Sequence, residues 1–237
     1  MSAAPSLEAE NARVRSAYAR RDVRRDASLY SAFSQANLFR IQECEHRMLR
    51  MLAAHGVSNL ESLRILEVGC GSGFWIREFI RWGARPENIT GVDLLAQRIA
   101  EARRLCPSGV TLQCQNAAQL DFEAGAFDLI IASTVFSSIL EGAVRARVAA
   151  EMLRVLGSSG TVLWYDFFRN NPANRDVRGV NKPEMQRLFP PCRLFAERVT
   201  LAPPLARALA GRSLSVCRAL GAMRIFDTHY LAAIRRR

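Results

Sequence analysis

The sequence predicts an α/β protein built on a largely parallel β-sheet with helices on both faces. Short apolar runs rich in Val, Ile and Leu alternate with stretches of helical periodicity from about residue 60 onward. These runs are apolar at consecutive positions, which is typical of parallel strands buried on both faces. A glycine-rich turn separates the first run from the next helix, and such turns let a ligand approach the backbone closely.

The composition limits the class of protein. The 237 residues are 49% hydrophobic and 23% charged, which suits one globular domain with a modest addition. No apolar run reaches about 18 residues, so we expect no membrane-spanning helix, and the polar, acidic first residues do not resemble a secretory signal. Six cysteines are scattered without a C-x-x-C pair. We therefore expect a cytoplasmic protein with reduced thiols and no metal site.

The net charge of +11 suits an anionic partner, such as nucleic acid, a membrane surface or a phosphorylated substrate. The arginines, however, are spread along the whole chain, and Lys182 is the only lysine. Basic surfaces that bind nucleic acid usually cluster on one face. The spread favours a general bias in composition, and we expect no nucleic-acid partner.

The N-terminal part, residues 1–58, differs in texture from the rest. Residues 1–26 are polar and rich in Ala and Arg, so we expect a flexible or loosely helical segment. Residues 29–55 place Leu38, Ile41 and Met48 at helical spacings, which predicts an amphipathic helix that ends near Gly56 and caps the main domain.

Strands and helices alternate through the main domain, residues 59–237. The predicted strands are "RILEVGC", "NITGVDLL", "GVTLQCQN", "FDLIIAST", "GTVLWYDFF", "CRLFAERVTL" and "HYLAAIRRR". The predicted helices between them are "GFWIREFIRWG", "AQRIAEARRLC", "AVRARVAAEMLRVLG" and "KPEMQRLFP".

The glycine turn carries the strongest functional signal. It reads "LEVGCGSGFW" from Leu66 to Trp75, and it follows a strand and opens a helix. Asp93 ends the next strand, 20 residues after Gly73, where a carboxylate can accept hydrogen bonds from both hydroxyls of a ribose. This arrangement predicts an adenosine-type cofactor.

The stretch "LEVGCGSG" resembles motif I of the class I S-adenosylmethionine-dependent methyltransferases, in particular the small-molecule (type 11/12) enzymes. The resemblance covers residues 60–237 and implies a Rossmann-like seven-stranded sheet in the order 3-2-1-4-5-7-6, with strand 7 antiparallel. It implies S-adenosylmethionine as cofactor and S-adenosylhomocysteine as product. The alternatives are a nicotinamide-binding Rossmann domain, for which the G-x-G-x-x-G spacing is absent, and a relic that binds nothing.

The resemblance also implies the cofactor contacts. The glycines make room for the methionine portion, Glu67 holds its ammonium group, and Asn116 stands where many relatives carry the Asp that contacts adenine. The N-terminal helix adds Tyr30, with Phe33 and Asn37 as further candidates. The full set is Glu67, Gly69, Cys70, Gly71, Gly73, Asp93, Leu94, Asn116, Ala117, Ser133 and Tyr30.

The implied topology suggests a catalytic base. Strand 5 would end near Asp166, and the antiparallel strand 7 would start near His229 at the same edge of the sheet. An Asp that orients a neutral His is a common general base near pH 7. The alternative is structural: His229 caps its strand and Asp166 pairs with an arginine such as Arg169.

Two segments at this edge are candidates for binding the acceptor. The loop after strand 5 is unusually polar, and its candidates are Tyr165, Asn170, Asn171, Asn174, Arg175 and Arg178. Its Asn-Asn-Pro sequence is equally a turn signal. The segment 202–228 is apolar with a basic side, and it suggests a helical lid, a peripheral membrane contact or core packing.

The preferred function is in-line methyl transfer to an oxygen of a small molecule, such as a sugar, a lipid-like compound or a secondary metabolite. The Asn/Asp-Pro-Pro-Tyr/Phe motif of enzymes that methylate adenine or glutamine amides is absent from "ASTVFSS". The alternatives are an RNA or other macromolecule methyltransferase and a non-catalytic cofactor-binding protein. We expect a monomer or a homodimer.

Overall fold

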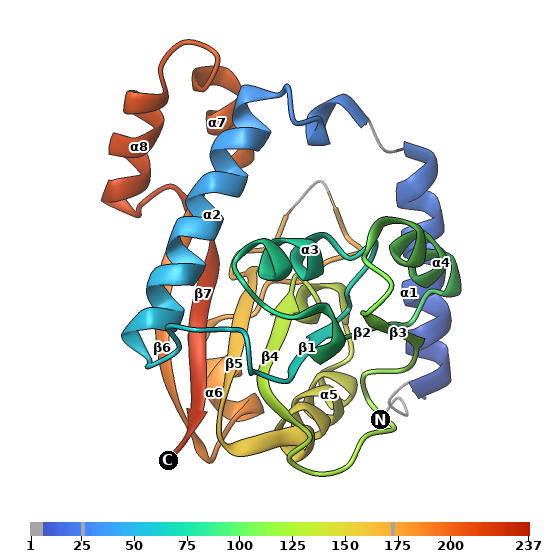
Figure 1. Cartoon of the computed structure of the whole chain (residues 1–237). Helices are drawn as coiled ribbons and strands as arrows, with labels where there is room; N and C mark the ends of the chain where they lie inside the picture. The colour runs from blue at the N-terminus through green and yellow to red at the C-terminus, as the bar shows by residue number, and fades with distance from the viewer. Residues whose placement is uncertain (1–6, 25–26, 172–173) are drawn as a thin grey trace.

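The computed structural model describes residues 7–24, 27–171 and 174–237. Seven strands form one sheet in the order β3-β2-β1-β4-β5-β7-β6, with helices around it (Figure 1). Strand β7 runs antiparallel to both of its neighbours. The predicted fold class, strand order and orientation of strand 7 are therefore confirmed.

The strands are β1 Ile65–Val68, β2 Ile89–Asp93, β3 Thr111–Cys114, β4 Phe127–Ser133, β5 Leu156–Phe167, β6 Cys192–Leu201 and β7 Asp227–Arg236. The helices are α1 Leu7–Arg24, α2 Gln35–Ala54, α3 Phe74–Arg81, α4 Ala96–Leu105, α5 Gly142–Val155, α6 Lys182–Leu188, α7 Pro203–Leu209 and α8 Leu214–Met223, with short 3₁₀ turns η1 Ala27–Tyr30, η2 Pro86–Asn88 and η3 Phe136–Ser138. Helix α2 begins at Gln35, later than predicted, because Ser34 caps it and accepts a hydrogen bond from the Asn37 amide.

The sheet is buried on both faces, as its apolar strands predict. Along β4, Ile130 and Ala132 face the helices α5 and α6, whereas Leu129 and Ile131 face α2, α3 and α4. Strands β1 to β5 pair in parallel, and β6 runs antiparallel to β7 and hence parallel to β5. Every strand except β7 therefore ends at one edge of the sheet, which we call the carboxyl edge.

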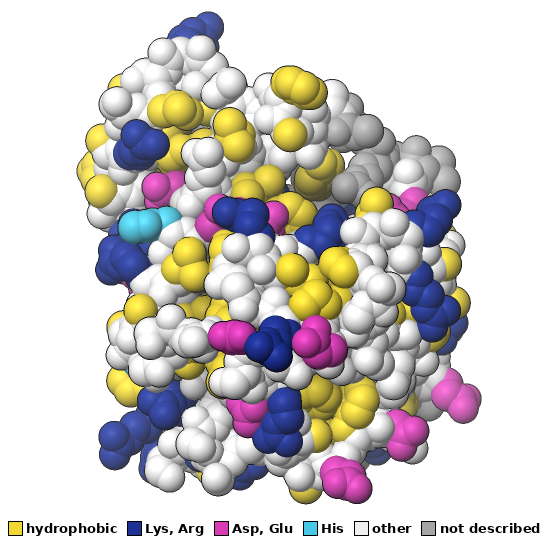
Figure 2. Space-filling view, in the orientation of Figure 1, with side chains coloured by type: hydrophobic (Ala, Val, Ile, Leu, Met, Phe, Trp, Pro, Cys, Tyr) yellow, Lys and Arg dark blue, Asp and Glu magenta, His cyan; other side chains and the backbone are white. Residues whose placement is uncertain are grey.

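The segment between β6 and β7 is a helical hairpin, α7 and α8, that leaves and rejoins the sheet at the carboxyl edge. It packs beside one end of α2 (Figure 1). A small apolar cluster joins the hairpin to α2 and β6: Phe39, Leu201, Ala206, Ala210 and Cys217. The surface of this part of the molecule carries both hydrophobic and basic side chains (Figure 2).

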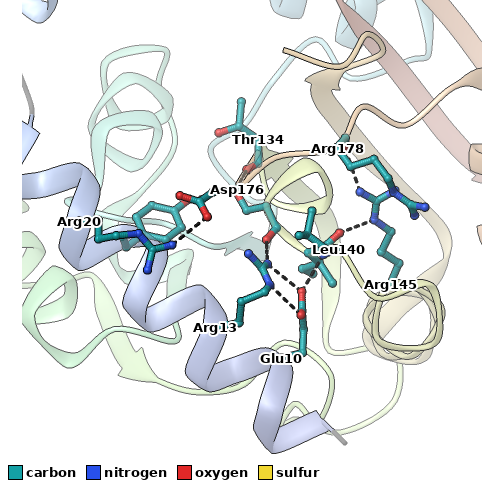
Figure 3. A network of polar contacts seen from close by, with 11 residues as sticks. Glu10, Arg13, Arg20, Thr134, Leu140, Arg145, Asp176 and Arg178 are labelled. Atoms are coloured by element: carbon teal, nitrogen blue, oxygen red, sulfur yellow. Dashed lines mark hydrogen bonds and ion pairs between the residues drawn. The ribbon is translucent and has the colours of Figure 1, made fainter. Parts of the chain in front are cut away.

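Helix α1 corrects the expectation that residues 1–26 are flexible or loosely helical. Residues 7–24 form a regular helix held by polar contacts (Figure 3). Glu10 is buried, pairs with Arg13 at 2.8 Å and accepts a hydrogen bond from the Leu140 amide at 2.6 Å. Arg13 also donates to the carbonyl of Ser138. The sequence concealed this helix because long-range polar contacts, not an apolar stripe, hold it in place.

Two ion pairs extend the attachment of α1 along its length. Arg20 pairs with Asp176 in the loop after β5 at 2.8 Å, and Asp22 pairs with Arg98 on α4. The helix thus contacts the η3 turn, the loop after β5 and α4 together. Residues 1–6 and 25–26 lie outside the described residues.

Arg145 is a fully buried cation that joins α5 to the loop after β5 and to α6. Its guanidinium donates to the carbonyls of Ile139 at 2.6 Å and Arg178 at 2.8 Å, and it pairs with Glu184 at 2.7 Å. Removing this side chain takes the guanidinium donor from both carbonyl groups and leaves Glu184 with Arg178 as its remaining ion-pair partner.

We therefore expect Arg145→Ala to lower the free energy of unfolding by about 3 kcal/mol, measured by urea denaturation. Arg147→Ala is the matched control, since Arg147 is exposed on the same helix, and its effect should stay within about 0.5 kcal/mol. Equal effects of the two substitutions would show that the buried contacts do not stabilise the fold.

Candidate active site

A cavity of about 350 Å³ opens at the carboxyl edge, where β1, β2 and β4 end. Its walls are the glycine turn, the ends of these strands, the turn after β3 and one face of α1. This volume lies within the usual range for small-molecule pockets. The edge is also where ligands bind in open parallel sheets.

The glycine turn has a backbone that only glycine adopts readily. Gly69, Gly71 and Gly73 have φ of 68°, 54° and 73°. A Cβ at Gly69 would lie 2.7 Å from Val135, and one at Gly73 would lie 2.4 Å from the Cys106 sulfur, so both glycines permit close packing. A Cβ at Gly71 would meet no atom within 4 Å, and Gly71 lines the cavity. This turn therefore presents bare backbone to a ligand.

Asp93 holds the glycine turn and also faces the cavity. One carboxylate oxygen accepts the Gly71 amide at 2.9 Å, and the other accepts the Leu95 amide at 2.9 Å. Burial raises the pKa of Asp93 despite these bonds. Each oxygen keeps a second lone pair, so the carboxylate can still accept hydrogen bonds from a diol.

Glu67 is the second carboxylate in the cavity wall. Its side chain is 2% exposed and accepts one hydrogen bond, from the Ile76 amide at 3.1 Å. Burial raises the pKa of Glu67 well above its usual range, and the negative charge of Asp93 adds to this effect. Two carboxylates so close together favour a cationic ligand, whose charge would stabilise both.

The remaining predicted cofactor residues fall into two groups. Cys70, Leu94, Asn116, Ala117 and Ser133 line the cavity with Glu67, Gly69, Gly71 and Asp93. Gly73 lies behind the turn as the residue before α3, and Tyr30 is 56% exposed on η1, outside the cavity lining. Asn116 uses its side-chain oxygen to accept the Ala118 amide at 2.9 Å.

The α1 wall is the part of the site that the sequence reasoning missed. Its lining residues are Glu10, Asn11, Val14, Tyr18 and Arg21. They recur at helical spacing and so lie on one face of α1. The spacing is present in the sequence, but most of these residues are polar. Apolar periodicity therefore gives no signal for this face of α1. The expected cap, α2, contributes no residue to the cavity lining.

Hydroxyl groups gather where β4 ends in the cavity. Trp75 donates its indole N–H to the Ser133 hydroxyl at 3.1 Å, and the hydroxyls of Tyr18 and Ser138 lie 3.2 Å apart. Thr134 between them has a φ of 55°, an uncommon conformation for a β-branched residue. Such strained residues cluster at functional sites, where the surrounding structure must hold them.

The predicted Asp166–His229 pair does not form, which corrects the catalytic assignment. Phe167 stands opposite His229 in the antiparallel pair, and Asp166 stands opposite Tyr230. Side chains alternate between the faces of a strand, so the one-residue offset puts Asp166 and His229 on opposite faces of the sheet.

Each of the two side chains has its own buried surroundings. His229 stacks on Tyr165 with ring centroids 4.6 Å apart, and its Nδ1 lies 2.9 Å from the Thr228 hydroxyl. Burial, and then the charge of Arg40, lower the pKa of His229 to about 3. Asp166 accepts the Ser137 amide at 3.0 Å on the other face, where burial raises its pKa to about 6. Neither residue lines the cavity.

The predicted acceptor loop lies beside the site without lining the cavity. Asn170 and Asn174 accept the backbone amides of Gly179 and Asp176, at 2.9 and 3.0 Å. Arg178 pairs with Glu184 at 2.9 Å, while Asn171 and Arg175 are exposed. Tyr165 is buried, with its hydroxyl 2.8 Å from that of Thr200. Pro172 lies outside the described residues.

Within the described parts of the chain, no group of three His, Cys, Asp or Glu side chains could hold a metal ion. No helix among the described residues is long and apolar enough to cross a bilayer. A helical lid over the acceptor was one of the three interpretations of residues 202–228. This segment contributes no residue to the cavity lining.

Comparison with known proteins agrees with this geometry. Residues 65–160 match the family model described as a methyltransferase domain. The methyltransferase phqN of Penicillium fellutanum is 33% identical over 138 residues, which cover 53% of this chain and 40% of the relative. A ubiquinone biosynthesis O-methyltransferase of Methylocella silvestris is 34% identical over 98 residues, which cover 40% of this chain and 37% of the relative. The matching regions thus span less than half of these relatives.

Solved structures share the fold at low identity. The 1,6-didemethyltoxoflavin-N1-methyltransferase of Burkholderia thailandensis, with 1,6-didemethyltoxoflavin and S-adenosylhomocysteine bound, has a TM-score of 0.66 and 18% identity. The match covers 100% of this chain and 92% of that one. An S-adenosylmethionine-dependent methyltransferase of Mesorhizobium loti has a TM-score of 0.60 and 18% identity, with coverage of 81% and 96%. Residues 65–160 are therefore similar to a methyltransferase domain, and the solved structures show that the fold is shared.

The raised pKa of Asp166 makes a prediction about stability. The unfolded chain releases this proton near pH 4 and the folded protein near pH 6, so the free energy of unfolding falls as pH rises through this window. The loss amounts to roughly 3 kcal/mol. Asp166→Asn should remove this part of the pH dependence, measured by urea denaturation from pH 4 to 7. Asp121→Asn, at an exposed site, should keep it; the same slope in both variants would contradict the assignment.

Proposed function

We propose that this chain carries a class I S-adenosylmethionine-dependent methyltransferase domain, which binds S-adenosylmethionine in the cavity at the carboxyl edge and methylates a small molecule. One observation carries the proposal. The glycine turn, Glu67, Asp93 and Asn116 all meet in one cavity, although they come from separate strands and turns. The family match to residues 65–160 includes all of these residues.

The donor groups of the cavity fit the parts of this cofactor. Gly71 gives bare backbone beside the methionine portion, and Glu67 with Asp93 supplies negative charge for its ammonium and sulfonium groups. Asp93 accepts from the ribose hydroxyls, and Asn116 lies at the adenine end. When bound, S-adenosylmethionine supplies an electrophilic methyl group on sulfur and leaves as S-adenosylhomocysteine.

The chain itself orients the acceptor and excludes water from it. Helix α1 covers the cavity with Val14 and Tyr18, which removes solvent from the reaction. The hydroxyls of Ser133, Tyr18 and Ser138 lie at the end of β4, where they can hold a polar acceptor in line with the methyl group.

Asp166 and His229 are not placed to take a proton from the acceptor together, since they lie on opposite faces of the sheet. Glu10 is the carboxylate of α1 in the cavity wall. Burial alone would raise its pKa, but the contacts to Arg13 and the Leu140 amide lower it overall, so Glu10 is an anion at neutral pH. Because Arg13 and Leu140 already use its oxygens, its first role is to hold α1 closed.

A small, oxygen-bearing acceptor suits the site and the relatives better than a macromolecule. The O-methyltransferase names among the relatives support an oxygen acceptor. The basic charge gives no single docking track for nucleic acid, because many arginines pair with acids, including Arg64 with Asp128 and Arg85 with Glu61.

Cofactor binding tests the proposal directly. Calorimetry should show that S-adenosylhomocysteine binds to the full chain and that NAD does not. Asp93→Ala removes the acceptor for both ribose hydroxyls and the anchor of the Gly71 amide, so the Kd for S-adenosylhomocysteine should rise at least about tenfold.

The control for this experiment is Asp121→Ala, which changes an exposed acid outside the cavity and should leave the Kd unchanged. Turnover is then followed as S-adenosylhomocysteine release with a panel of phenols, sugars and amphiphiles. Binding of NAD, or an unchanged Kd in Asp93→Ala, would overturn the cofactor assignment; binding without turnover on any acceptor would leave a cofactor-binding protein that is not an enzyme.

Closure by α1 makes a separate prediction. Glu10→Ala breaks the contacts to Arg13 and Leu140, so a smaller fraction of the molecules has α1 in place. The apparent Kd for S-adenosylhomocysteine should then rise about fivefold, since only the closed form binds well. Limited proteolysis within residues 7–24 should become faster.

Glu8→Ala is the matched control, because Glu8 is exposed one turn or less from Glu10 on the same helix. It should change neither the Kd nor the proteolysis rate. If Glu10→Ala behaves like Glu8→Ala in both measurements, then α1 does not close the cofactor cavity.

A further inference from the structure

The outer side of the α7–α8 hairpin is exposed and apolar. Val216 is 46% exposed, Met223 55%, Ile225 55% and Phe226 39%. These are four of the nine large hydrophobic side chains that are exposed in the described part of the chain, and they fall within residues 216–226. Exposed apolar side chains that gather on one element mark a contact surface.

The packing of the hairpin does not need these side chains. Its inner side buries Ala206, Ala210 and Cys217 against Phe39 and Leu201. The Ala202 amide donates to the Phe226 carbonyl at 2.9 Å and closes the base of the hairpin. The fold is thus complete without the outer residues, which remain available for a partner.

The charge of the hairpin identifies the kind of partner. Residues 202–226 contain no acidic residue. They contain four arginines: Arg207, Arg212, Arg218 and Arg224. Arg224 pairs with Glu197 at 2.9 Å, and the other three are exposed with no ion pair among the described residues. Figure 2 shows dark blue side chains among yellow ones in the region where Figure 1 places α7 and α8.

Apolar side chains beside unpaired arginines are typical of helices that lie on anionic membranes. The apolar groups enter the boundary between headgroups and acyl chains, and the guanidinium groups contact lipid phosphates. A protein partner would have to be both acidic and apolar on one face. Helix α8 has ten residues, about 15 Å, so it can lie on a bilayer and not cross it.

The hairpin also lies at the edge of the sheet where the candidate active site opens. It leaves β6 and enters β7 at the carboxyl edge, the same edge at which the candidate cofactor cavity opens. A membrane on this side would bring amphiphilic molecules to that edge.

We propose that the outer face of the α7–α8 hairpin docks this protein on an anionic lipid surface. Val216, Met223, Ile225 and Phe226 enter the headgroup boundary, and the exposed arginines of the hairpin contact lipid phosphates. The docking itself is independent of catalysis. Its consequence, an amphiphilic acceptor drawn from the bilayer, rests on the proposed methyl transfer.

Vesicle sedimentation tests the docking. The full chain is mixed with sucrose-loaded vesicles of phosphatidylcholine, alone or with about one third phosphatidylglycerol. We expect binding to the mixed vesicles that weakens as salt rises, and little binding to phosphatidylcholine alone. The triple variant Met223→Ser/Ile225→Ser/Phe226→Ser should lose at least about tenfold in partitioning to the mixed vesicles.

Two further variants separate the contributions. Arg207→Gln/Arg218→Gln should weaken binding to the mixed vesicles and flatten its salt dependence. Leu105→Ser is the matched control, since Leu105 is 49% exposed at the end of α4, and it should bind like the unchanged protein. Affinity for S-adenosylhomocysteine should be the same in all variants and shows that each is folded.

The proposal is overturned if the unchanged protein does not bind the mixed vesicles, or if the triple variant binds them as well as Leu105→Ser does. It is also overturned if sedimentation velocity shows dimers that only the triple variant breaks, because the face then binds a second copy. The proposal is likewise overturned if the protein binds inorganic phosphate but binds the mixed vesicles no better than phosphatidylcholine alone. The arginines would then bind a free anion and not a lipid surface. If the protein binds S-adenosylhomocysteine but not the vesicles, only the docking proposal fails. If it binds the vesicles but not S-adenosylhomocysteine, only the proposed function fails.

Discussion

The contact between the Asp93 carboxylate and the Gly71 amide fixes the geometry on which the site depends. It ties the turn after β1 to the end of β2, and the amides of Gly69 and Cys70 bind the Val92 carbonyl of the same strand. Because Gly69, Gly71 and Gly73 adopt positive φ, the chain bends sharply enough to place bare backbone beside the carboxylates of Glu67 and Asp93. Loss of the Asp93 carboxylate would leave the Gly71 amide, in the cavity wall, without this acceptor. The same acidic side chain thus holds the turn and faces the cavity.

Helix α1 closes the cavity through a network of polar contacts, and this explains how a segment with little apolar surface can be ordered. Glu10 is the centre of that network, since it joins α1 to the η3 turn through Arg13 and the Leu140 amide. Arg20 and Asp176 join the same helix to the loop after β5. That loop, rich in Asn and Arg, therefore influences the cavity by holding its cover. Asn170 and Asn174 of this loop accept turn hydrogen bonds, and Arg178 pairs with Glu184.

The sequence predicted those parts of the molecule that depend on local pattern and failed where a long-range choice decides. The glycine turn followed from motif spacing, because a turn that needs Gly69, Gly71 and Gly73 leaves little freedom for its neighbours. The strand order followed from the resemblance of that motif to the methyltransferase family. The Asp166–His229 pair failed because a one-residue offset in an antiparallel register sends neighbouring side chains to opposite faces, and no pattern in either strand reports that offset. The α1 wall was missed because the residues that face the cavity, from Glu10 to Arg21, are mostly polar, and their value appears only once the partners on η3 and α4 are in place.

The positive net charge of the chain has two parts. Part of it is structural: Arg145 is buried among carbonyls, Arg154 binds the carbonyls of Leu120 and Phe122, and Arg64 pairs with Asp128. The charges of these arginines are used in contacts within the fold. They also lie in separate elements, so they do not form one positively charged surface. The hairpin differs, because residues 202–226 contain four arginines and no acid, and exposed hydrophobic side chains lie in the same stretch. The two ends of the carboxyl edge are therefore unlike each other: α1 closes one end with paired charges, and the hairpin presents unpaired cations and apolar groups at the other. An acceptor that is polar at the reacting atom and apolar elsewhere matches both, since its polar group suits the hydroxyls at the end of β4 and its apolar part suits the hairpin side.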